Sequence, residues 1–506
     1  MANTINFQGK PFHFIGIGGI GMSALAYILA KRNLPVSGSD IRSTHITQRL
    51  ESAGAHIFSR QDADNLDFFK MPTEDHPAPI TIGVGVEGNG NNGGYGATQV
   101  QDSNPPQVIC STAIQANNAE YQAAQAQGYP IFHRSDVLAA LIEDYDSIAV
   151  AGTHGKTTTS SLIGYVLLQG GLDPTIVIGG EVNAIGGNAR LGQGGYLVAE
   201  ADESDGSLVK LAAKIGVVTN IELDHPDHYD SLDEVTEIFR IFEQQCETMV
   251  ACWDCATVRS TLRPQITYSL FPEQGADYTV TDVVYSAEGT TAQVWEKDVL
   301  LGSLHLPLLG QHNLSNTLAA IAVARHLGLS FPVIAQGIST FEGAKRRFEY
   351  RGQANGITFV DDYAHHPSEV QATLGAARLL VQQNAQSQGA YRRLVAVFQP
   401  HRYSRTQAFL GDFAQSFQDA DLVIVTDIYS AGESPVGQLG GEQVADAIAH
   451  YHPQVIYGGG LEPVTALLEE MLQPGDLTLF LGAGNLNQII PHLLVFYSKV
   501  SLPTSV

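Results

Sequence analysis

About a third of the way along the chain, one segment combines the residue types that bind a polyphosphate. Residues 151–159 read Ala-Gly-Thr-His-Gly-Lys-Thr-Thr-Thr, after the apolar run 147–150 and before a helix-like run. A strand, a glycine turn and a helix start in this order direct backbone N–H groups and the helix N-terminus at an anion. The pattern predicts that Lys156 lies against the β- and γ-phosphates of ATP and that the Thr157 hydroxyl takes a Mg²⁺ position.

This loop departs from the general phosphate-loop pattern at one position. The pattern has a glycine five residues before Gly155, where this chain has Val150, and Gly152 is supplied instead. An ordinary strand-to-helix turn with an exposed lysine is the alternative, but Gly-Lys-Thr-Thr-Thr in this context favours a nucleotide site. The predicted ATP-binding residues of the loop are Gly152, Thr153, His154, Gly155, Lys156, Thr157 and Thr158.

A second glycine-rich turn lies near the N-terminus. Gly16, Gly18 and Gly21 form G-x-G-x-x-G after the apolar run 11–15 and before a helix-like run, in the order that a Rossmann-like βαβ unit requires. Asp40 follows the last glycine by 19 residues (40 − 21), and an acid at this distance commonly meets a ribose hydroxyl. The motif fits NAD, FAD or any pyrophosphate nucleotide, and a tight turn that only packs a helix is the alternative.

Carboxylates follow an apolar run in the middle of the chain. Glu200 directly ends that run, where its carboxylate could reach a Mg²⁺ seated on Thr157, because hard cations favour oxygen ligands. For Asp202, Glu203 and Asp205, a solvated acidic loop is an equally good interpretation. Strands that end in acids beside a phosphate loop predict a metal-phosphate site at the carboxyl edge of a sheet.

A histidine among acids follows the next strand-like run. His225 lies between Glu222, Asp224 and Asp227, which is unusual company for a core histidine. A histidine binds Mg²⁺ only weakly, so the residues alone leave two interpretations open, a general base or a satisfied surface side chain.

Composition limits the class of protein and its partners. The 506 residues are 44% hydrophobic and carry 27 Lys and Arg against 52 Asp and Glu, for a net charge of -25. The length predicts about three domains, and the charge argues against nucleic-acid or anionic-membrane binding. Four cysteines are too few for a disulfide scaffold, and the pair Cys252 and Cys255 lacks a second pair for a zinc site. Because the chain has neither a secretory h-region nor a membrane-length apolar run, we expect a cytoplasmic protein.

Strand-like and helix-like runs alternate throughout the chain, which predicts an α/β fold of three domains. We expect a Rossmann-like domain at 1–146, an ATPase-type domain with the phosphate loop and a mixed or parallel sheet at 147–345, and a second Rossmann-like α/β domain at 346–506. Residues 83–106 are dense in Gly and Asn and lack the apolar content to pack, which predicts a floppy surface insertion.

Seven blocks of sequence, taken in order, resemble the Mur ligase family. They are the phosphate loop at 152–159, Glu-Ala-Asp-Glu-Ser-Asp at 200–205, Asn-Ile-Glu-x-Asp-His at 220–225, Gly-Gln-His-Asn-Leu-Ser-Asn at 310–316, Arg-Arg-Phe at 346–348, Asp-Asp-Tyr-Ala-His-His-Pro at 361–367 and Pro-His-Arg-Tyr-Ser-Arg-Thr at 400–406. The N-terminal Gly-Ile-Gly-Gly-Ile-Gly-Met-Ser fits the same pattern, so the resemblance covers nearly the whole chain. The Gly/Asn-rich insertion, Pro226, His228 and Ser315 depart from it, and His228 adds a second candidate beside His225.

The resemblance implies a role for each matching residue. Lys156 would neutralise the phosphates of ATP, Thr157 and Glu200 would hold one Mg²⁺ or Mn²⁺, and His225 would bind a second metal. His225 or His365 would accept the proton of the attacking amine. The other implied site residues are His312 and Asn313 near the adenine; Gly16, Gly18, Gly19, Gly21, Met22, Asp40, Ser111, Asn188 and Arg190 for a UDP-sugar; Arg346 and Arg347 for phosphates and carboxylate; and His365, Arg402 and Arg405 for the incoming amino acid.

The reaction that the resemblance implies is ATP-dependent amide formation. L-alanine would be joined to the lactyl carboxylate of UDP-N-acetylmuramate through an acyl phosphate, in cytoplasmic synthesis of the peptidoglycan precursor. The alternatives are a sister ligase that attaches a recycled murein tripeptide to the same sugar-nucleotide, an NAD-dependent dehydrogenase and a nucleotide-sensing module without turnover. We expect a monomer or a homodimer.

One family feature is missing from this chain. Some Mur ligases carry a carbamoylated lysine on the helix after the Asp-His block, where it orders the second metal. Residues 231–247 contain no lysine, and arginine forms no stable carbamate because its guanidinium stays protonated. The second metal is therefore expected to rely on His225, substrate oxygens and water.

Overall fold

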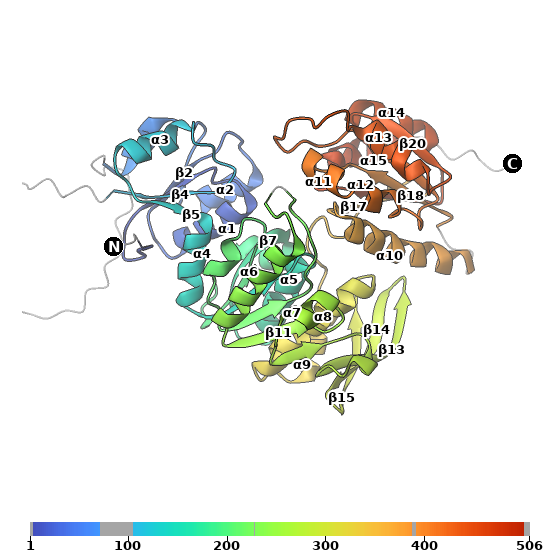
Figure 1. Ribbon diagram of the computed structural model, residues 1–506, viewed down its shortest axis with the longest axis horizontal. Helices are drawn as coiled ribbons and strands as arrows, with labels where there is room; N and C mark the ends of the chain where they lie inside the picture. The colour runs from blue at the N-terminus through green and yellow to red at the C-terminus, as the bar shows by residue number, and fades with distance from the viewer. Residues whose placement is uncertain (1–3, 71–104, 227, 387–390, 500–506) are drawn as a thin grey trace, which may run out of the picture. The chain divides into compact units, whose positions relative to one another are not determined.

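The computed structural model describes residues 4–70, 105–226, 228–386 and 391–499 (Figure 1). Their strands form three sheets, which follow one another along the chain. The chain divides into two compact units, one made of residues 1–144 and 188–191 and the other of the remaining residues. The insertion predicted at 83–106 lies, apart from its last two residues, outside the described residues.

Five parallel strands form the first sheet, in the order β3-β2-β1-β4-β5. The first glycine turn joins β1 to α1, as a Rossmann-like unit requires. Strand β1 is buried along its whole length, because the sheet is covered on both faces. The elements are β1 Phe12–Ile15, α1 Ile20–Lys31, β2 Val36–Ser39, α2 His45–Ser52, β3 His56–Phe58, β4 Gln107–Cys110, α3 Ala119–Ala126, β5 Ile131–His133 and α4 Arg134–Glu143.

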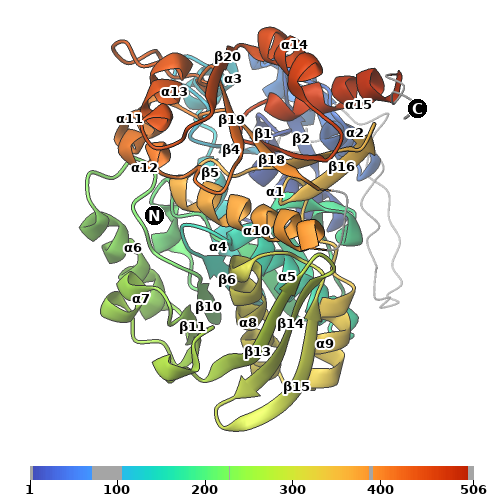
Figure 2. The ribbon, with the colours of Figure 1, turned by 90° about the vertical axis from the view of Figure 1, so that its right-hand side faces the viewer.

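Ten strands form the second sheet, in the order β15-β14-β13-β12-β11-β10-β6-β9-β7-β8. Neighbouring strands from β13 to β7 pair in parallel, whereas β13, β14 and β15 pair as antiparallel hairpins beside α8 and α9 (Figure 2). The elements are β6 Asp146–Ala151, α5 Lys156–Gln169, β7 Thr175–Val182, β8 Gly187–Arg190, β9 Tyr196–Glu200, β10 Ile215–Val218, α6 Leu232–Gln245, β11 Thr248–Cys252, α7 Ala256–Thr261, β12 Ile266–Tyr268, β13 Tyr278–Ser286, β14 Gly289–Glu296, β15 Val299–Leu306, α8 Gln311–His326 and α9 Phe331–Ser339.

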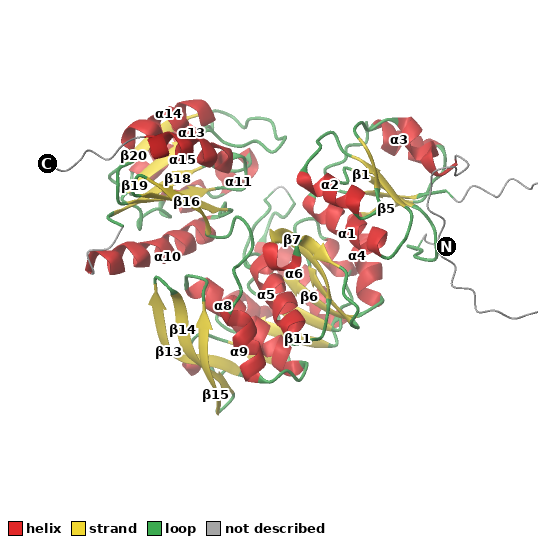
Figure 3. Ribbon diagram, turned by 180° about the vertical axis from the view of Figure 1, so that it is seen from behind, coloured by secondary structure: helices red, strands yellow, loops and turns green. Residues whose placement is uncertain are grey.

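Six strands form the third sheet, in the order β16-β17-β21-β18-β19-β20, and only β16 pairs antiparallel. Figure 3 shows β16, β18, β19 and β20 of this sheet near helices α13, α14 and α15. Side chains alternate along β18, so that Leu394 and Phe398 join one apolar core while Val395 and Val397 join the other. The elements are β16 Glu349–Ala354, β17 Ile357–Asp362, α10 Pro367–Gln386, β18 Arg393–Phe398, α11 Tyr403–Ala408, α12 Leu410–Ala414, β19 Leu422–Thr426, α13 Gly441–Ala449, β20 Val455–Gly459, α14 Leu461–Met471, β21 Asp476–Leu481 and α15 Ile490–Lys499.

The predicted fold class is confirmed, since three α/β domains with mainly parallel sheets follow one another along the chain. Strands β9, β6 and β10 are neighbours in the second sheet, so the loops after their carboxyl ends share one edge. These loops contain the phosphate loop, the acidic block that starts at Glu200 and the block that ends at His225. Within the described residues, no helix has both the length and the apolar character needed to cross a membrane.

Candidate active site

Two glycines fix the shape of the phosphate loop between β6 and α5. Gly152 has φ +136° and Gly155 has φ +81°, and such backbone conformations favour glycine. A Cβ on Gly152 would lie 2.0 Å from Thr219 Oγ1, and a Cβ on Gly155 would lie 2.5 Å from Asn316 Oδ1. Gly155 also caps α5, whose first N–H groups have no partner within the helix. The loop therefore presents a helix N-terminus to an anion.

Lys156, the first residue of α5, folds back over the loop. Its Nζ donates to Gly152 O at 2.7 Å and to both carboxylate oxygens of Glu203 at 2.9 Å. Glu203 is only 3% exposed, so the interpretation of this residue as part of a solvated acidic loop is wrong. Burial lowers the pKa of Lys156, but the nearby carboxylates of Glu203, Asp202 and Glu200 together outweigh burial and raise the pKa above the usual range. Lys156 is therefore charged and able to neutralise a phosphate.

Thr157 and Glu200 meet beside the loop, as a Mg²⁺ site requires. Thr157 Oγ1 donates to Glu200 Oε1 at 3.1 Å, and the Gly179 N–H donates to Glu200 Oε2 at 2.7 Å. A hydroxyl and a carboxylate side by side supply the oxygen ligands that Mg²⁺ prefers, so these residues fit the ion.

His225 stands in a strained turn next to a buried ion pair. Its φ is +59°, which is uncommon for a side chain other than glycine. The adjacent carboxylate of Asp224 accepts from Arg405 Nε at 2.9 Å and from Arg405 Nη2 at 3.2 Å. Burial lowers the pKa of His225, so the imidazole is neutral and has the form that a metal ligand needs. His228, the second candidate, is exposed.

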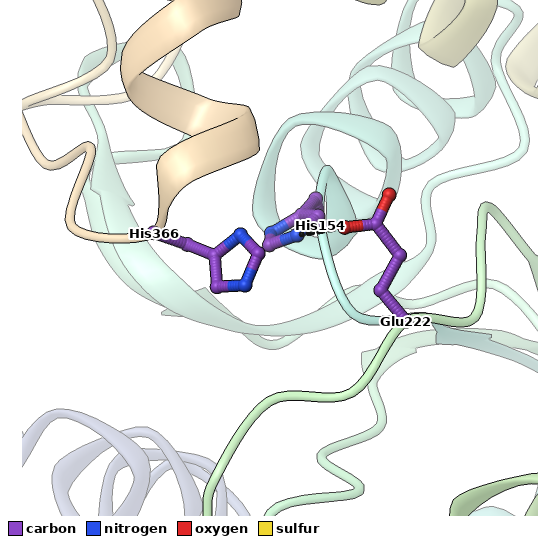
Figure 4. Close-up of side chains that lie close together, drawn as sticks. All are labelled: His154, Glu222 and His366. Atoms are coloured by element: carbon purple, nitrogen blue, oxygen red, sulfur yellow. Dashed lines mark hydrogen bonds and ion pairs between the residues drawn. The ribbon is translucent and has the colours of Figure 1, made fainter. Parts of the chain in front are cut away.

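His154 links the second sheet to the third. Its Nε2 lies 3.3 Å from Glu222 Oε2, and its Nδ1 lies 3.2 Å from Glu369 Oε1 in the first turn of α10. Burial lowers the pKa of His154, but its hydrogen bonds to the Glu222 and Glu369 carboxylates, with their charges, outweigh burial and raise the pKa to about 9. His366 packs beside the His154 ring (Figure 4).

A cavity of about 300 Å³ opens next to the phosphate loop. Its walls come from the loop itself, the region of Cys252 and Cys255, the start of α8 and the first turns of α10. His312 and Asn313, which were predicted to lie near the adenine, line this cavity. All four cysteines of the chain are free.

The residues that were predicted to bind the incoming amino acid lie around His401. The His365 ring centre lies 5.8 Å from that of His401, and Arg405 Nη1 lies 3.3 Å from His401 Nδ1. Arg402 lies one residue from His401, with a φ of +67° and an ion pair to Glu433. Burial lowers the pKa of His365 to about 4, so its ring is neutral.

The two arginines of the Arg-Arg-Phe block contact different parts of the structure. Arg346 donates to Gly482 O at 2.6 Å and pairs with the buried Asp361 at 3.3 Å. Arg347 lines the cavity, and its Nη1 lies 3.8 Å from Glu369 Oε1. The structure therefore directs Arg347 toward the cavity beside the phosphate loop and Arg346 into the third domain.

The predicted UDP-sugar residues belong to the smaller compact unit. Gly18 N–H donates to Asp40 Oδ2 at 2.9 Å, so this carboxylate shapes the glycine turn. The buried Asn188 amide donates to Ile20 O at 2.6 Å and to Ser23 Oγ at 2.9 Å. Gly16 has φ +77°, Gly19 caps α1, Gly21 and Met22 lie in α1, Ser111 follows β4 and Arg190 ends β8.

Sequence reasoning missed one residue at the centre of the site. Glu369 accepts from the His365 N–H at 3.0 Å, besides its contacts with His154 and Arg347. Burial raises the pKa of Glu369, but the charges and hydrogen bonds of its basic neighbours outweigh burial and hold the pKa well below the usual range. Its position two residues after the Asp-Asp-Tyr-Ala-His-His-Pro block was the available signal.

Three family models match successive parts of the chain. They are described as the Mur ligase catalytic domain at residues 11–146, the Mur ligase middle domain at 150–324 and the Mur ligase glutamate ligase domain at 346–484.

Individual proteins are also similar to the chain, in sequence or in structure, over nearly its whole length. A UDP-N-acetylmuramate–L-alanine ligase of Gloeothece citriformis is 64% identical over 495 residues, which cover 98% of this chain and 99% of that protein. The crystal structure of a UDP-N-acetylmuramate-alanine ligase from Thermotoga maritima is 26% identical, with a TM-score of 0.76 and coverage of 97% and 99%. A murein peptide ligase of Psychrobacter arcticus shares the fold at 22% identity, with a TM-score of 0.67 and coverage of 98% and 100%. The chain belongs to the Mur ligase family.

Proposed function

We propose that the chain is an ATP-dependent ligase that joins L-alanine to the lactyl carboxylate of UDP-N-acetylmuramate. The observation that carries the reaction class is the charged Lys156 at the start of α5, beside the Thr157 and Glu200 oxygens. The choice of L-alanine rests on relatives such as the Gloeothece protein, whose name states that reaction. Attachment of a recycled tripeptide is not favoured, because the murein peptide ligase at 22% identity supports the fold alone.

The first step activates the carboxylate. A lactyl oxygen attacks the γ-phosphorus in line, which gives an acyl phosphate and ADP. Protein groups contribute mainly by positioning and charge neutralisation. Lys156 and the N-terminus of α5 would stabilise the phosphate charge, and Arg347 would reach the same phosphates from the third domain. Mg²⁺ held by Thr157 and Glu200, with His225 for a second metal, would supply further neutralisation when bound.

The second step forms the amide. The neutral amine of L-alanine attacks the acyl carbon, and phosphate leaves from a tetrahedral intermediate. Arg402 and Arg405 would hold the amino-acid carboxylate, since guanidinium binds carboxylates in a bidentate manner. Arg405 already makes such a pair with Asp224, so the substrate would compete for it. His365 or His225, each with a lowered pKa, would accept the amine proton.

The remaining assignments complete this proposal. UDP-N-acetylmuramate would bind to the first glycine turn, Asp40, Ser111, Asn188 and Arg190, and the adenine would bind near His312 and Asn313. The three domains would extend over 1–146, 147–345 and 346–506. The protein would act in the cytoplasm as a monomer or homodimer, with Mn²⁺ able to replace Mg²⁺.

Phosphate release in the presence of ATP, Mg²⁺ and UDP-N-acetylmuramate tests the amine that this ligase uses. L-alanine, the murein tripeptide and no amine are compared at equal concentrations. We expect release that depends on both L-alanine and the sugar-nucleotide, without any change in nicotinamide absorbance. Faster turnover with the tripeptide would reassign the substrate, and ATP binding without turnover would reduce the protein to a nucleotide sensor.

A further inference from the structure

Three side chains of the larger compact unit meet beside the phosphate loop. His154 comes from the loop, Glu222 follows β10 and His366 directly precedes α10 (Figure 4). One potential ligand atom from each lies within 4.8 Å of the others, and within the described part of the chain this is the only such group of three His, Cys, Asp or Glu residues. The reaction proposed above gives Glu222 and His366 no role.

The spacing between the first two ligand atoms suits a tetrahedral ion. His154 Nε2 lies 3.3 Å from Glu222 Oε2. Zinc binds imidazole nitrogen and carboxylate oxygen at about 2.0–2.1 Å, so two ligands at the tetrahedral angle are about 3.3 Å apart. The two atoms therefore stand at the separation that a shared zinc ion needs.

Both of these side chains also have the supporting contacts that are typical of metal ligands. The other ring nitrogen of His154, Nδ1, lies 3.2 Å from Glu369 Oε1. Ser368 Oγ donates to Glu222 Oε2 at 2.9 Å. A carboxylate behind the ligating histidine and a hydrogen bond to the ligating carboxylate fix the orientation of each and strengthen metal binding.

His366 adds a third ligand from the other side of the cluster. It is 5% exposed, and its ring centre lies 4.7 Å from that of His154. Its Nδ1 accepts from the Ser368 N–H at 3.3 Å, and its Nε2 is buried without a hydrogen-bond partner among the residues that the structure describes. Such an unpartnered nitrogen costs free energy unless a ligand or an ion satisfies it.

We propose that His154, Glu222 and His366 bind one Zn²⁺, at a site distinct from the Mg²⁺ position at Thr157 and Glu200. Two imidazoles and one carboxylate form a donor set that zinc uses with a fourth position open, whereas Mg²⁺ requires mainly oxygen ligands. The metal replaces the proton on His154 Nε2, because metal ligands must be deprotonated.

Zinc at this site joins the phosphate loop to the start of α10. His154 also lines the cavity beside the phosphate loop, so a metal that fixes its ring would restrict the loop where ATP is proposed to bind. Zinc then inhibits the ligase, and excess ATP relieves the inhibition. This last consequence rests on the proposed function, whereas the metal site itself does not.

Zinc binding is measured on the full chain, stripped with a chelator and held in excess Mg²⁺ so that the oxygen-rich site is occupied. Zn²⁺ is titrated in competition with a chromophoric chelator, and Co²⁺ absorption reports tetrahedral coordination. The variants are His366→Asn and Glu222→Gln, and the side chain of Glu222 is 42% exposed, so its replacement leaves the fold intact. His492→Asn is the control, because His492 also lies against a glutamate, at 2.6 Å, but does not belong to the group of three.

We expect one Zn²⁺ per wild-type chain, bound at least about 10-fold more weakly in each site variant and unchanged in the control. The tetrahedral Co²⁺ spectrum disappears in the same two variants. Equal zinc affinity in wild type and His366→Asn would overturn the site, and so would the absence of stoichiometric binding to the wild type. Because no substrate is present, failure here leaves the ligase assignment untouched, whereas lack of turnover in zinc-free buffer would contradict that assignment alone.

Discussion

At the scale of single residues, the site depends on charges that the folded chain holds in place. Lys156 stays protonated because Glu203 faces it in a buried environment. In the proposed mechanism, the phosphates of ATP would take the place of the Glu203 carboxylate on Nζ. The lysine would then serve as a preorganised charge for the reacting phosphate, a kind of contribution that lowers a transition-state barrier strongly.

Replacement of Lys156 by Ala is expected to lower kcat by at least about 100-fold, as does the loss of one preorganised charge contact. Binding of the UDP-sugar should be retained, because its proposed site lies in the smaller compact unit, to which Lys156 does not belong. Steady-state phosphate release and calorimetric titration of the sugar-nucleotide measure the two effects. Lys214→Ala is the matched control, since this half-exposed lysine pairs with Asp146 on the surface. Near-normal ligation by Lys156→Ala would remove the lysine from the mechanism.

The two histidines of the Asp-His block are expected to differ. His225→Ala should lose most activity and require more Mg²⁺, because the neutral, largely buried imidazole is the proposed ligand of the second metal. His228→Ala should have a milder effect, since His228 is exposed. The ligation rates of both variants are measured across a Mg²⁺ titration. A larger loss of activity in His228→Ala than in His225→Ala would assign the metal to His228.

At the scale of elements, the first turn of α10 holds the third domain on the second. Glu369 contacts His154 of the phosphate loop, and Ser368 contacts Glu222. A buried pair between Arg405 of α11 and Asp224 adds to this contact. The loops that surround the cavity beside the phosphate loop are thus joined by charged side chains, whose protonation depends on pH.

The charge of His154 makes the contact between the phosphate loop and α10 sensitive to alkaline pH. Its folded-state pKa is raised to about 9, so its stabilising effect is complete below the ordinary pKa of 6.5 and is lost as the pH rises through about 9. Between pH 7 and pH 10, the free energy of unfolding of the wild type, measured by urea unfolding in the presence of a chelator, should fall by up to about 3 kcal/mol. The His154→Asn variant should lose less free energy of unfolding over the same interval. Equal losses in the two proteins would show that His154 does not cause the effect.

The residue types in helix α6 predict the effect of bicarbonate on the ligation rate. It contains no lysine, and its only basic residue is the exposed Arg240. No carbamate can therefore form on this helix. Ligation rates in CO₂-free buffer should equal those with added bicarbonate, as a coupled phosphate assay would show. A clear stimulation by bicarbonate would place a carbamoylated group elsewhere in the site.

At the scale of the whole molecule, the sequence predicted what depends on local pattern. The phosphate loop, the Rossmann-like turn and the order of the three sheets follow from glycines, apolar runs and strand ends within short stretches of chain. The burial of Glu203, the Asp224–Arg405 pair and the contacts of Glu369 could not be predicted in this way. Asp224 and Arg405 are 181 residues apart, so only the tertiary fold brings them together.

In the proposed reaction, ATP activates the lactyl carboxylate as an acyl phosphate. The most direct test of this step uses UDP-N-acetylmuramate labelled with ¹⁸O in that carboxylate, together with ATP, Mg²⁺ and L-alanine. Attack of a carboxylate oxygen on the γ-phosphorus transfers that oxygen to the phosphate that is later released. We predict that mass spectrometry finds one ¹⁸O atom in each phosphate, whereas unlabelled phosphate formed together with the amide product would contradict the mechanism.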